Sequence, residues 1–190
     1  DGQISAGKDL NLRLQDSFTT QNKIEAGNNL TIETAGDLIN TTELQAGSAL
    51  SLKAKDIDNK DTGRLIANTG THIQGSNLTN RGEINSNGQT LIELDKTLNN
   101  IGTGRIYGDH VAISANKVLN QEEQTASETK AAVIASRDRL DLAAKNIVNR
   151  ENALISSEGN MVIAGELDAN KHAIGQAQSL NNNSATIEAG

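Results

Sequence analysis

Three stretches near the start of the chain follow one pattern: AGKDLNLRLQ (Ala6–Gln15), AGNNLTIETA (Ala26–Ala35) and AGSALSLKAK (Ala46–Lys55). They begin 20 residues apart, and after each Ala-Gly pair apolar residues alternate with polar ones. A period of two is typical of a strand with one buried face. The pattern therefore predicts strands at a fixed spacing, with a sharp turn at each Ala-Gly pair, where glycine can adopt a positive φ.

The repeat extends along the whole chain as three apolar anchor positions in every unit. The step from a third anchor to the next first anchor is 8 residues, except from Ile106 to Ile113, where it is 7. The first anchors are Leu12, Ile32, Leu52, Ile73, Ile92, Ile113, Leu142 and Ile163. The second anchors are Phe18, Leu38, Ile57, Leu78, Leu98, Val118, Ile147 and Leu180, and the third run from Ile24 to Ile187. This constancy indicates one structural unit per repeat.

One unit of three short strands cannot bury its apolar edge, but stacked units can, because each strand pairs with its equivalent in the next unit. The sequence thus predicts an all-β fold: a right-handed parallel β-helix (solenoid) of about eight coils of roughly 20 residues, three short strands per coil. Coils about 4.8 Å apart give a rod of roughly 40 Å. Leu, Ile and Val occur 19, 18 and 5 times and aromatics make up 1%, which suits a thin prism filled by aliphatic stacks.

Two segments interrupt the repeat and are predicted to be insertions at about 121–132 and 165–179. The composition of the first, QEEQTASETKAA, favours a short exposed helix or loop. The two insertions leave different corners of the prism. Ile4 closes a coil whose start is missing, and Gly190 begins a turn toward a further coil. Residues 1–190 are therefore predicted to be a single β-helix segment of a larger protein.

Composition excludes several classes of partner. The net charge is −7 without a basic block, so no nucleic acid is expected to bind. The longest apolar runs are far too short for a transmembrane segment, and the first residues do not resemble a secretory signal. The absence of cysteine excludes disulfides and cysteine-ligated metal sites.

An aliphatic residue, any residue and then asparagine recur in the units, as in DLINT, DIDNK and NLTNR. This asparagine follows an inward anchor by two positions, so it points inward too. We interpret the column as a structural ladder in which each side chain bonds the next coil, in preference to a ligand-binding row of amides. Its members are Asn40, Asn59, Asn80, Asn100, Asn120, Asn149 and Asn182, with Thr20 in that place in the first unit.

Parallel β-helices also include polysaccharide-degrading enzymes, so the carboxylates and histidines need inspection. Asp56 and Asp58 flank an inward anchor, as Asp37 does one coil earlier, and such a pair could serve glycoside hydrolysis or bind Ca²⁺. The sequence offers no basic column at a fixed offset and no aromatic platform for a sugar. We therefore predict no catalytic residues, no cofactor, no metal site and no enzymatic activity.

The remaining titratable residues are predicted to lie on the surface. One segment alternates arginines with aspartates: Arg137, Asp138, Arg139 and, two residues later, Asp141. We interpret them as surface ion pairs that add little to the stability of the fold. His72, His110 and His172 are far apart in sequence and make neither a metal site nor a triad. Ile92 faces inward and its neighbour Glu93 outward, so Glu93→Lys is expected to be nearly silent.

The repeated AG units, NALISSEGNMVIAGELDA (Asn152–Ala169) and SLNNNSATIEAG (Ser179–Gly190) resemble the haemagglutinin repeats of the filamentous haemagglutinin family. These are very large exoproteins exported by two-partner secretion in Gram-negative bacteria, and they include adhesins and CdiA-type contact-dependent growth inhibition proteins. The resemblance implies a secreted, extracellular filament at the bacterial cell surface. It also implies an outer-membrane β-barrel transporter as a partner.

The resemblance predicts a structural and adhesive filament segment that presents binding or toxin regions away from the cell. The alternative is a receptor-binding module that uses the two insertions to contact a host cell or a target bacterium, and a polysaccharide-degrading enzyme is the third choice. Inserted loops on a rigid scaffold often carry binding residues. The candidate receptor contacts are Glu122, Glu123, Glu128 and Lys130 in the first insertion and Glu166, Asp168, Lys171 and His172 in the second.

Overall fold

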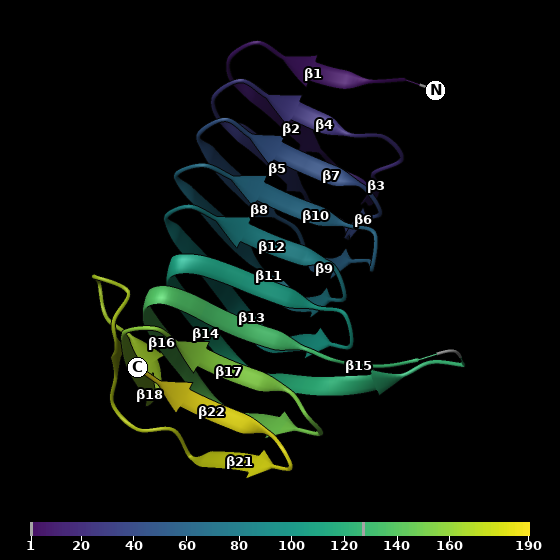
Figure 1. Cartoon of the computed structure of the whole chain (residues 1–190). Coiled ribbons are helices and arrows are strands. Elements are labelled where there is room, and N and C mark those ends of the chain that lie inside the picture. The colour runs from purple at the N-terminus through teal and green to yellow at the C-terminus, as the bar shows by residue number, and fades with distance from the viewer. Residues whose placement is uncertain (1, 127) are drawn as a thin grey trace.

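The computed structural model describes residues 2–126 and 128–190, so Asp1 and Ser127 lie outside the described residues. The chain winds as a parallel β-solenoid of about eight turns, which confirms the predicted fold class (Figure 1). Equivalent strands of successive coils pair in parallel, as in Ile4 with Ile24 and Leu30 with Leu50. We number the coils 1 to 8 by their first anchors, from Leu12 in coil 1 to Ile163 in coil 8. In the described part of the chain no helix is long and apolar enough to cross a membrane.

The coils form three faces, each named after the anchor that its strands carry. The first face contains β2 (Leu10–Leu14), β5 (Leu30–Thr34), β8 (Ala49–Lys53) and β18 (Asn160–Ala164). The second face contains β3 (Phe18–Thr19), β6 (Leu38–Asn40), β9 (Asp56–Asn59) and β21 (Ser179–Asn183). The third contains β1 (Ile4–Ala6), β4 (Ile24–Ala26), β7 (Glu43–Ala46), β10 (Arg64–Ala67), β12 (Glu83–Ser86), β17 (Leu154–Ser157) and β22 (Thr186–Ala189).

Four longer strands pass around corners of the prism without a break. Strands β11 (Gly70–Asn80) and β13 (Gln89–Ile101) each join the first and second faces of one coil. Strands β14 (Arg105–Gln124) and β16 (Val133–Arg150) begin on the third face of the preceding coil and continue over the next two faces. The prediction of three separate short strands per coil therefore holds for the first coils, whereas the middle coils are almost continuously extended.

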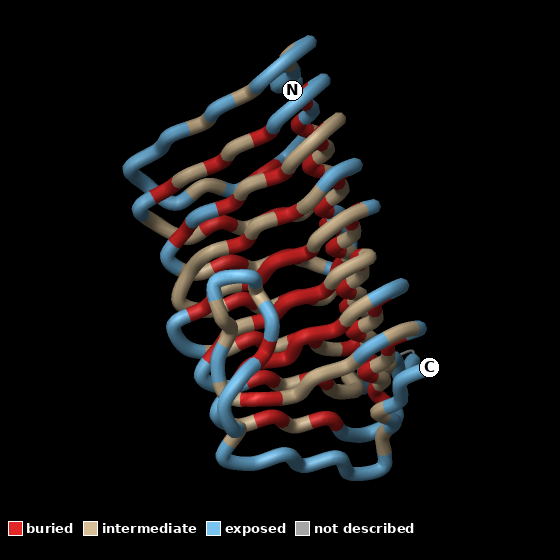
Figure 2. Tube along the Cα trace, turned by 90° about the vertical axis from the view of Figure 1, so that its left-hand side faces the viewer, coloured by how far each residue is buried: buried red, intermediate tan, exposed pale blue. Residues whose placement is uncertain are grey.

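Alternate residues of each strand point into the prism, and they form one aliphatic core. The anchors of coils 2 to 7 are almost completely buried, for example Ile32, Leu78 and Ile134, each at 0% exposure. Figure 2 shows the buried residues alternating with partly exposed ones along the strands. At the two ends of the stack the anchors are more exposed, because no coil covers them, and Leu180 in coil 8 reaches 49%.

The Ala-Gly turns differ from the sequence prediction in one respect. Among the described glycines only Gly102 and Gly175 have a positive φ, so Gly27 and Gly47 are not required for a left-handed backbone. A Cβ on Gly27 would lie 2.3 Å from the carbonyl oxygen of Gly7, and a Cβ on Gly47 2.0 Å from that of Gly27. Glycine is needed at these turns because successive coils approach each other too closely for a side chain.

Candidate functional site

The inward asparagines form a hydrogen-bonded ladder along the corner between the second and third faces. Each donates from Nδ2 to Oδ1 of the next asparagine at 2.7–2.9 Å, from Asn40 through to Asn182. Thr20 begins the column by donating to Asn40 at 2.7 Å. Asn40 to Asn149 are fully buried, whereas Asn182 is exposed in the last coil.

The second N–H of these amides bonds to the main chain of the third face. Nδ2 of Asn100 donates to the carbonyl of Val133 at 3.0 Å, and Nδ2 of Asn120 donates to that of Leu154 at 2.9 Å. Each of these two amides therefore links its own coil to the asparagine of the next coil and to a strand of the third face. Both N–H groups of such a side chain are used internally and its oxygen already accepts one internal bond, so these amides serve the structure of the prism.

The first insertion, residues 121–132, forms an antiparallel hairpin and not the helix or loop expected from its composition. The end of β14 pairs with β15 (Thr129–Ala131) through Glu122–Ala131, Glu123–Lys130 and Gln124–Thr129. The hairpin projects sideways from the prism in Figure 1. The two-stranded ladder continues the extended backbone of β14. The main-chain N–H and C=O groups of the insertion therefore bond across the hairpin, without a change from strand to helix.

The candidate contacts of this hairpin lie in two different environments. Glu122 and Glu123 are partly buried at its base, where Glu122 accepts from Nδ2 of Asn152 at 2.7 Å. Glu128 and Lys130 are exposed near the tip and form an ion pair at 3.3 Å. A cleft of about 280 Å³ separates the hairpin from the neighbouring corner of the prism.

The second insertion, residues 165–179, is called the strap here because it lies across the first face (Figure 2). It contains the short antiparallel strands β19 (Glu166–Leu167) and β20 (Ala173–Ile174). Oδ1 of Asp168 accepts from the backbone amides of Asn170 and His172 at 2.8 and 2.9 Å, which shapes the turn between them. Glu166 and His172 are exposed, and Lys171 is partly buried.

Beneath the strap the outward side of the first face is apolar, and burial of these apolar side chains explains why the strap lies there. Ala143, Ala164 and Ala173 form a second small core, against which Val162 and Leu167 pack. Leu91 and Ala112 are also buried, although they occupy outward positions of their strands. This break in the polar alternation is the sequence signal that could have identified the covered face.

Asp141 is fully buried under the strap, which corrects the prediction of a surface ion pair. Its carboxylate accepts from Arg139 at 2.5 and 2.9 Å, from the amide of Ala173 at 2.8 Å and from Nε2 of His110 at 2.8 Å. Burial raises the pKa of Asp141, but these hydrogen bonds outweigh burial and hold the pKa below its usual value. Asp138 remains exposed as expected.

The structure also brings together histidines that are distant in sequence. The rings of His110 and His172 lie 5.9 Å apart between centroids. His72 bonds through Nε2 to Glu93 at 2.7 Å, and Lys171 bonds to the other oxygen of Glu93 at 2.7 Å. Partial burial raises the pKa of Glu93, but the bonds from Lys171 and His72 lower it overall. The prediction that Glu93→Lys is silent is therefore withdrawn, because the new lysine would face Lys171 and His72.

The acidic residues of the second face have neighbours of their own. Asp56 accepts from Nδ2 of Asn77 at 2.8 Å, and Asp58 pairs with Lys60 at 2.5 Å. Within the described ranges 2–126 and 128–190, no three His, Cys, Asp or Glu side chains are grouped so that they could hold a metal ion.

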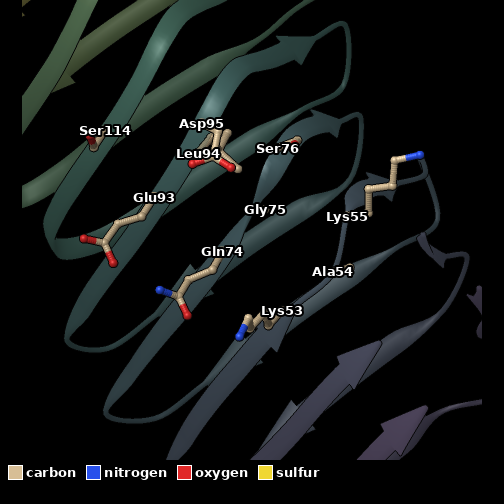
Figure 3. Close-up of a pocket in the computed structure, with 10 residues that line it drawn as sticks. All are labelled: Lys53, Ala54, Lys55, Gln74, Gly75, Ser76, Glu93, Leu94, Asp95 and Ser114. Atoms are coloured by element: carbon tan, nitrogen blue, oxygen red, sulfur yellow. The ribbon is translucent and has the colours of Figure 1, made fainter. Parts of the chain in front are cut away.

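A groove of about 570 Å³ lies at the corner between the first and second faces (Figure 3). Lys53, Gln74 and Glu93 lie along it on successive coils, and its floor includes Ala54 and Gly75. The residues that line it carry charges of both signs and no aromatic ring. The groove is therefore an open polar surface and not an enclosed pair of carboxylates.

Comparison with known proteins agrees with this geometry of regular coils. The family profile described as "Haemagglutinin repeat" matches residues 1–42, 34–127 and 123–190. The toxin CdiA of Yersinia pestis is 34% identical over 110 residues, which cover 53% of this chain and 3% of that protein. The chain thus spans a small part of its relative's length, and no solved structure matches it. Since the profile matches together extend from residue 1 to residue 190, the chain belongs to the haemagglutinin repeat family.

Proposed function

We propose that this chain is a filament segment of a large exoprotein that two-partner secretion exports to the surface of a Gram-negative bacterium. Its task is to hold binding or toxin regions at a distance from the cell. The observation that carries this proposal is the uninterrupted stack, in which strands of each coil pair with those of the next along the rod. The family match and the similarity to the CdiA toxin support an outer-membrane transporter as partner and a structural role in preference to catalysis.

A spacer depends on regular coils and not on a particular one, so it tolerates the loss of a whole coil. The test removes Gly27–Ala46 from the parent protein in its native bacterium, which joins Ala26 to Gly47 and keeps the Ala-Gly turn. The expected result is normal surface display with attachment to, or inhibition of, target cells retained. Removal of only Gly27–Gly36 is the control, because half a coil puts the inward positions out of register and should prevent display.

Loss of attachment or inhibition after the whole-coil deletion, with surface display intact, would contradict the spacer role. Such a result would mean that these particular coils contact the target.

A second candidate function is receptor binding through the insertions. The observation in its favour is the hairpin tip, where Glu128 and Lys130 are exposed beside a cleft of about 280 Å³. The test replaces both residues by alanine in the parent protein and measures binding to target cells. Loss of binding with unchanged thermal stability supports a receptor contact, whereas unchanged binding opposes it.

A further inference from the structure

In a solenoid, each coil normally contacts only the coils directly above and below it, so stability propagates between nearest neighbours. Most side-chain bonds here obey that rule, since they join residues about one coil apart, such as Asn29 and Asp9, 20 residues apart. A few bonds reach much farther. They begin in the hairpin, in the strap and at Arg137.

The hairpin reaches over a complete coil. Glu123 leaves coil 6 and accepts three bonds of 2.8–3.1 Å from the guanidinium of Arg81 in coil 4, 42 residues away. Its side chain crosses the turn of coil 5 at Gly102, where a Cβ would lie 2.8 Å from the Glu123 carboxylate. Bonding to Arg81 lowers the pKa of Glu123, so the pair is ionised at neutral pH.

The strap reaches over more coils. It leaves coil 8, bonds Asp141 in coil 7 through the amide of Ala173, and places His172 against His110 at the start of coil 6. Lys171 then pairs with Glu93 in coil 5 at 2.7 Å, 78 residues away in sequence. Lys171 has a φ of 65°, which L residues rarely adopt, so the backbone is strained at the residue that makes this contact.

A further long bond lies at the corner between the third and first faces. The guanidinium of Arg137 donates to Asp109, 28 residues away, and to the carbonyl of Ser86, 51 residues away, at 2.5 Å in each case. In coils 1 to 3, by contrast, the side-chain bonds that the structure gives for the described residues stay within one coil or join adjacent coils. Lys23, for example, contacts Glu43 at 3.1 Å and Gln45 at 2.5 Å in the next coil.

We infer that the hairpin and the strap are intramolecular tethers that make coils 4 to 8 unfold as one cooperative unit, while coils 1 to 3 open separately and more easily. A bond that skips a coil can be made only when every coil beneath it is folded. Opening any one of the bridged coils therefore breaks the tether as well, which couples their stabilities. This inference rests on the contacts of the chain and not on its proposed role as a filament.

Native-state hydrogen exchange of the 190-residue chain, followed by mass spectrometry in low urea, tests the inference. In the unmodified chain, strands of coils 4 to 8 should exchange with one common free energy and one urea dependence. Strands β2 and β5 of coils 1 and 2 should exchange earlier. Graded, independent values along coils 4 to 8 would overturn the inference.

The variant Lys171→Ala provides a sharper test, because the ion pair that it removes joins the strap of coil 8 to Glu93 in coil 5. Exchange should accelerate about fivefold in the strap and in β13, which holds Glu93, and equally in β14 and β16 of the bridged coils 6 and 7. This is the magnitude expected for a partly exposed ion pair. The variant Glu123→Ala removes the bonds to Arg81 and should accelerate exchange equally in β11 of coil 4, β13 of the bridged coil 5 and β14 of coil 6. Lys23→Ala is the matched control, because Lys23 and Lys171 have similar exposure, 38% and 32%, and it should affect adjacent strands only.

Acceleration confined in Lys171→Ala to the strap and to β13, which holds Glu93, or no change anywhere, would refute the tether. A simple loss of the Lys171–Glu93 contact predicts the first of these results, so the response of β14 and β16, which lie outside that contact, distinguishes coupling from local packing.

Discussion

At the scale of single residues, the buried asparagines show how a thin apolar prism tolerates polar groups. An amide transferred to an apolar interior costs several kcal/mol unless its hydrogen bonds are replaced. Asn100 meets this condition, because its oxygen accepts from Asn80 and its two N–H groups donate to Asn120 and Val133. The ladder is thus stabilising only as a connected column.

Removal of one asparagine from the middle of the ladder should strongly lower the free energy of unfolding. The change Asn100→Ala leaves a donor of Asn80 and an acceptor of Asn120 without partners in the core, which should cost about 3 kcal/mol or more. Asn182→Ala removes the exposed last member and should cost about 1 kcal/mol or less. Urea denaturation of both variants measures the difference, and equal losses would show that the column does not act as a buried ladder.

A second pair of variants tests which residues point into the prism and which point to solvent. Ile92→Asp places an unpaired carboxylate against the buried anchors Ile73 and Ile113 and should destabilise the fold by several kcal/mol. Asn116→Asp adds the same charge at an exposed position of coil 6 and should remain within about 0.5 kcal/mol. Thermal melting of both variants checks the assignment, and similar melting temperatures would contradict it.

At the scale of elements, the turns determine how closely the coils approach, and the Ala-Gly column allows a matched test. Gly47→Ala forces a Cβ to within 2.0 Å of the Gly27 carbonyl, so the coils must separate there, and we expect a loss of about 1–3 kcal/mol. Gly7→Ala changes the same turn in the first coil, where a Cβ meets nothing within 4 Å, and should be nearly silent. A silent Gly47→Ala variant in thermal melting would disprove the close approach.

The insertions should also make stability depend on pH. Glu93 and Glu123 have lowered pKa values in the fold, so each contributes stability above its unfolded pKa of about 4.3 and loses it as the pH falls through the folded pKa. The double variant Glu93→Gln, Glu123→Gln should therefore melt below the unmodified chain at pH 7, and the difference should close below about pH 4. A difference that persists unchanged at pH 3 would show that charge is not its cause.

At the scale of the whole molecule, the fold could be predicted from the sequence because one rule, an apolar anchor at equivalent positions, applies to every coil. Periodicity placed Ile92 and Asn100 correctly, since their environment is set by the neighbouring coils. It failed for Asp141 and Glu93, whose environment depends on the strap, 165–179, folding back over coils far away in sequence. Apolar residues at outward positions, such as Leu91 and Ala112, mark a covered face, but period and composition do not say which segment covers it. The contacts of the insertions therefore required the structure.

Equivalent residues of successive coils lie in straight columns along the rod. The pairing places Thr19, Asn99, Val148 and Asn181 in one such column, in coils 1, 5, 7 and 8. Because the chain has no cysteine, pairs of cysteines introduced at these sites can be spin-labelled specifically and their separations measured by pulsed electron paramagnetic resonance. With about 4.8 Å per coil, the separations from residue 19 should be about 19, 29 and 34 Å for residues 99, 148 and 181. Separations that do not rise by about 5 Å per coil would contradict the stacked solenoid.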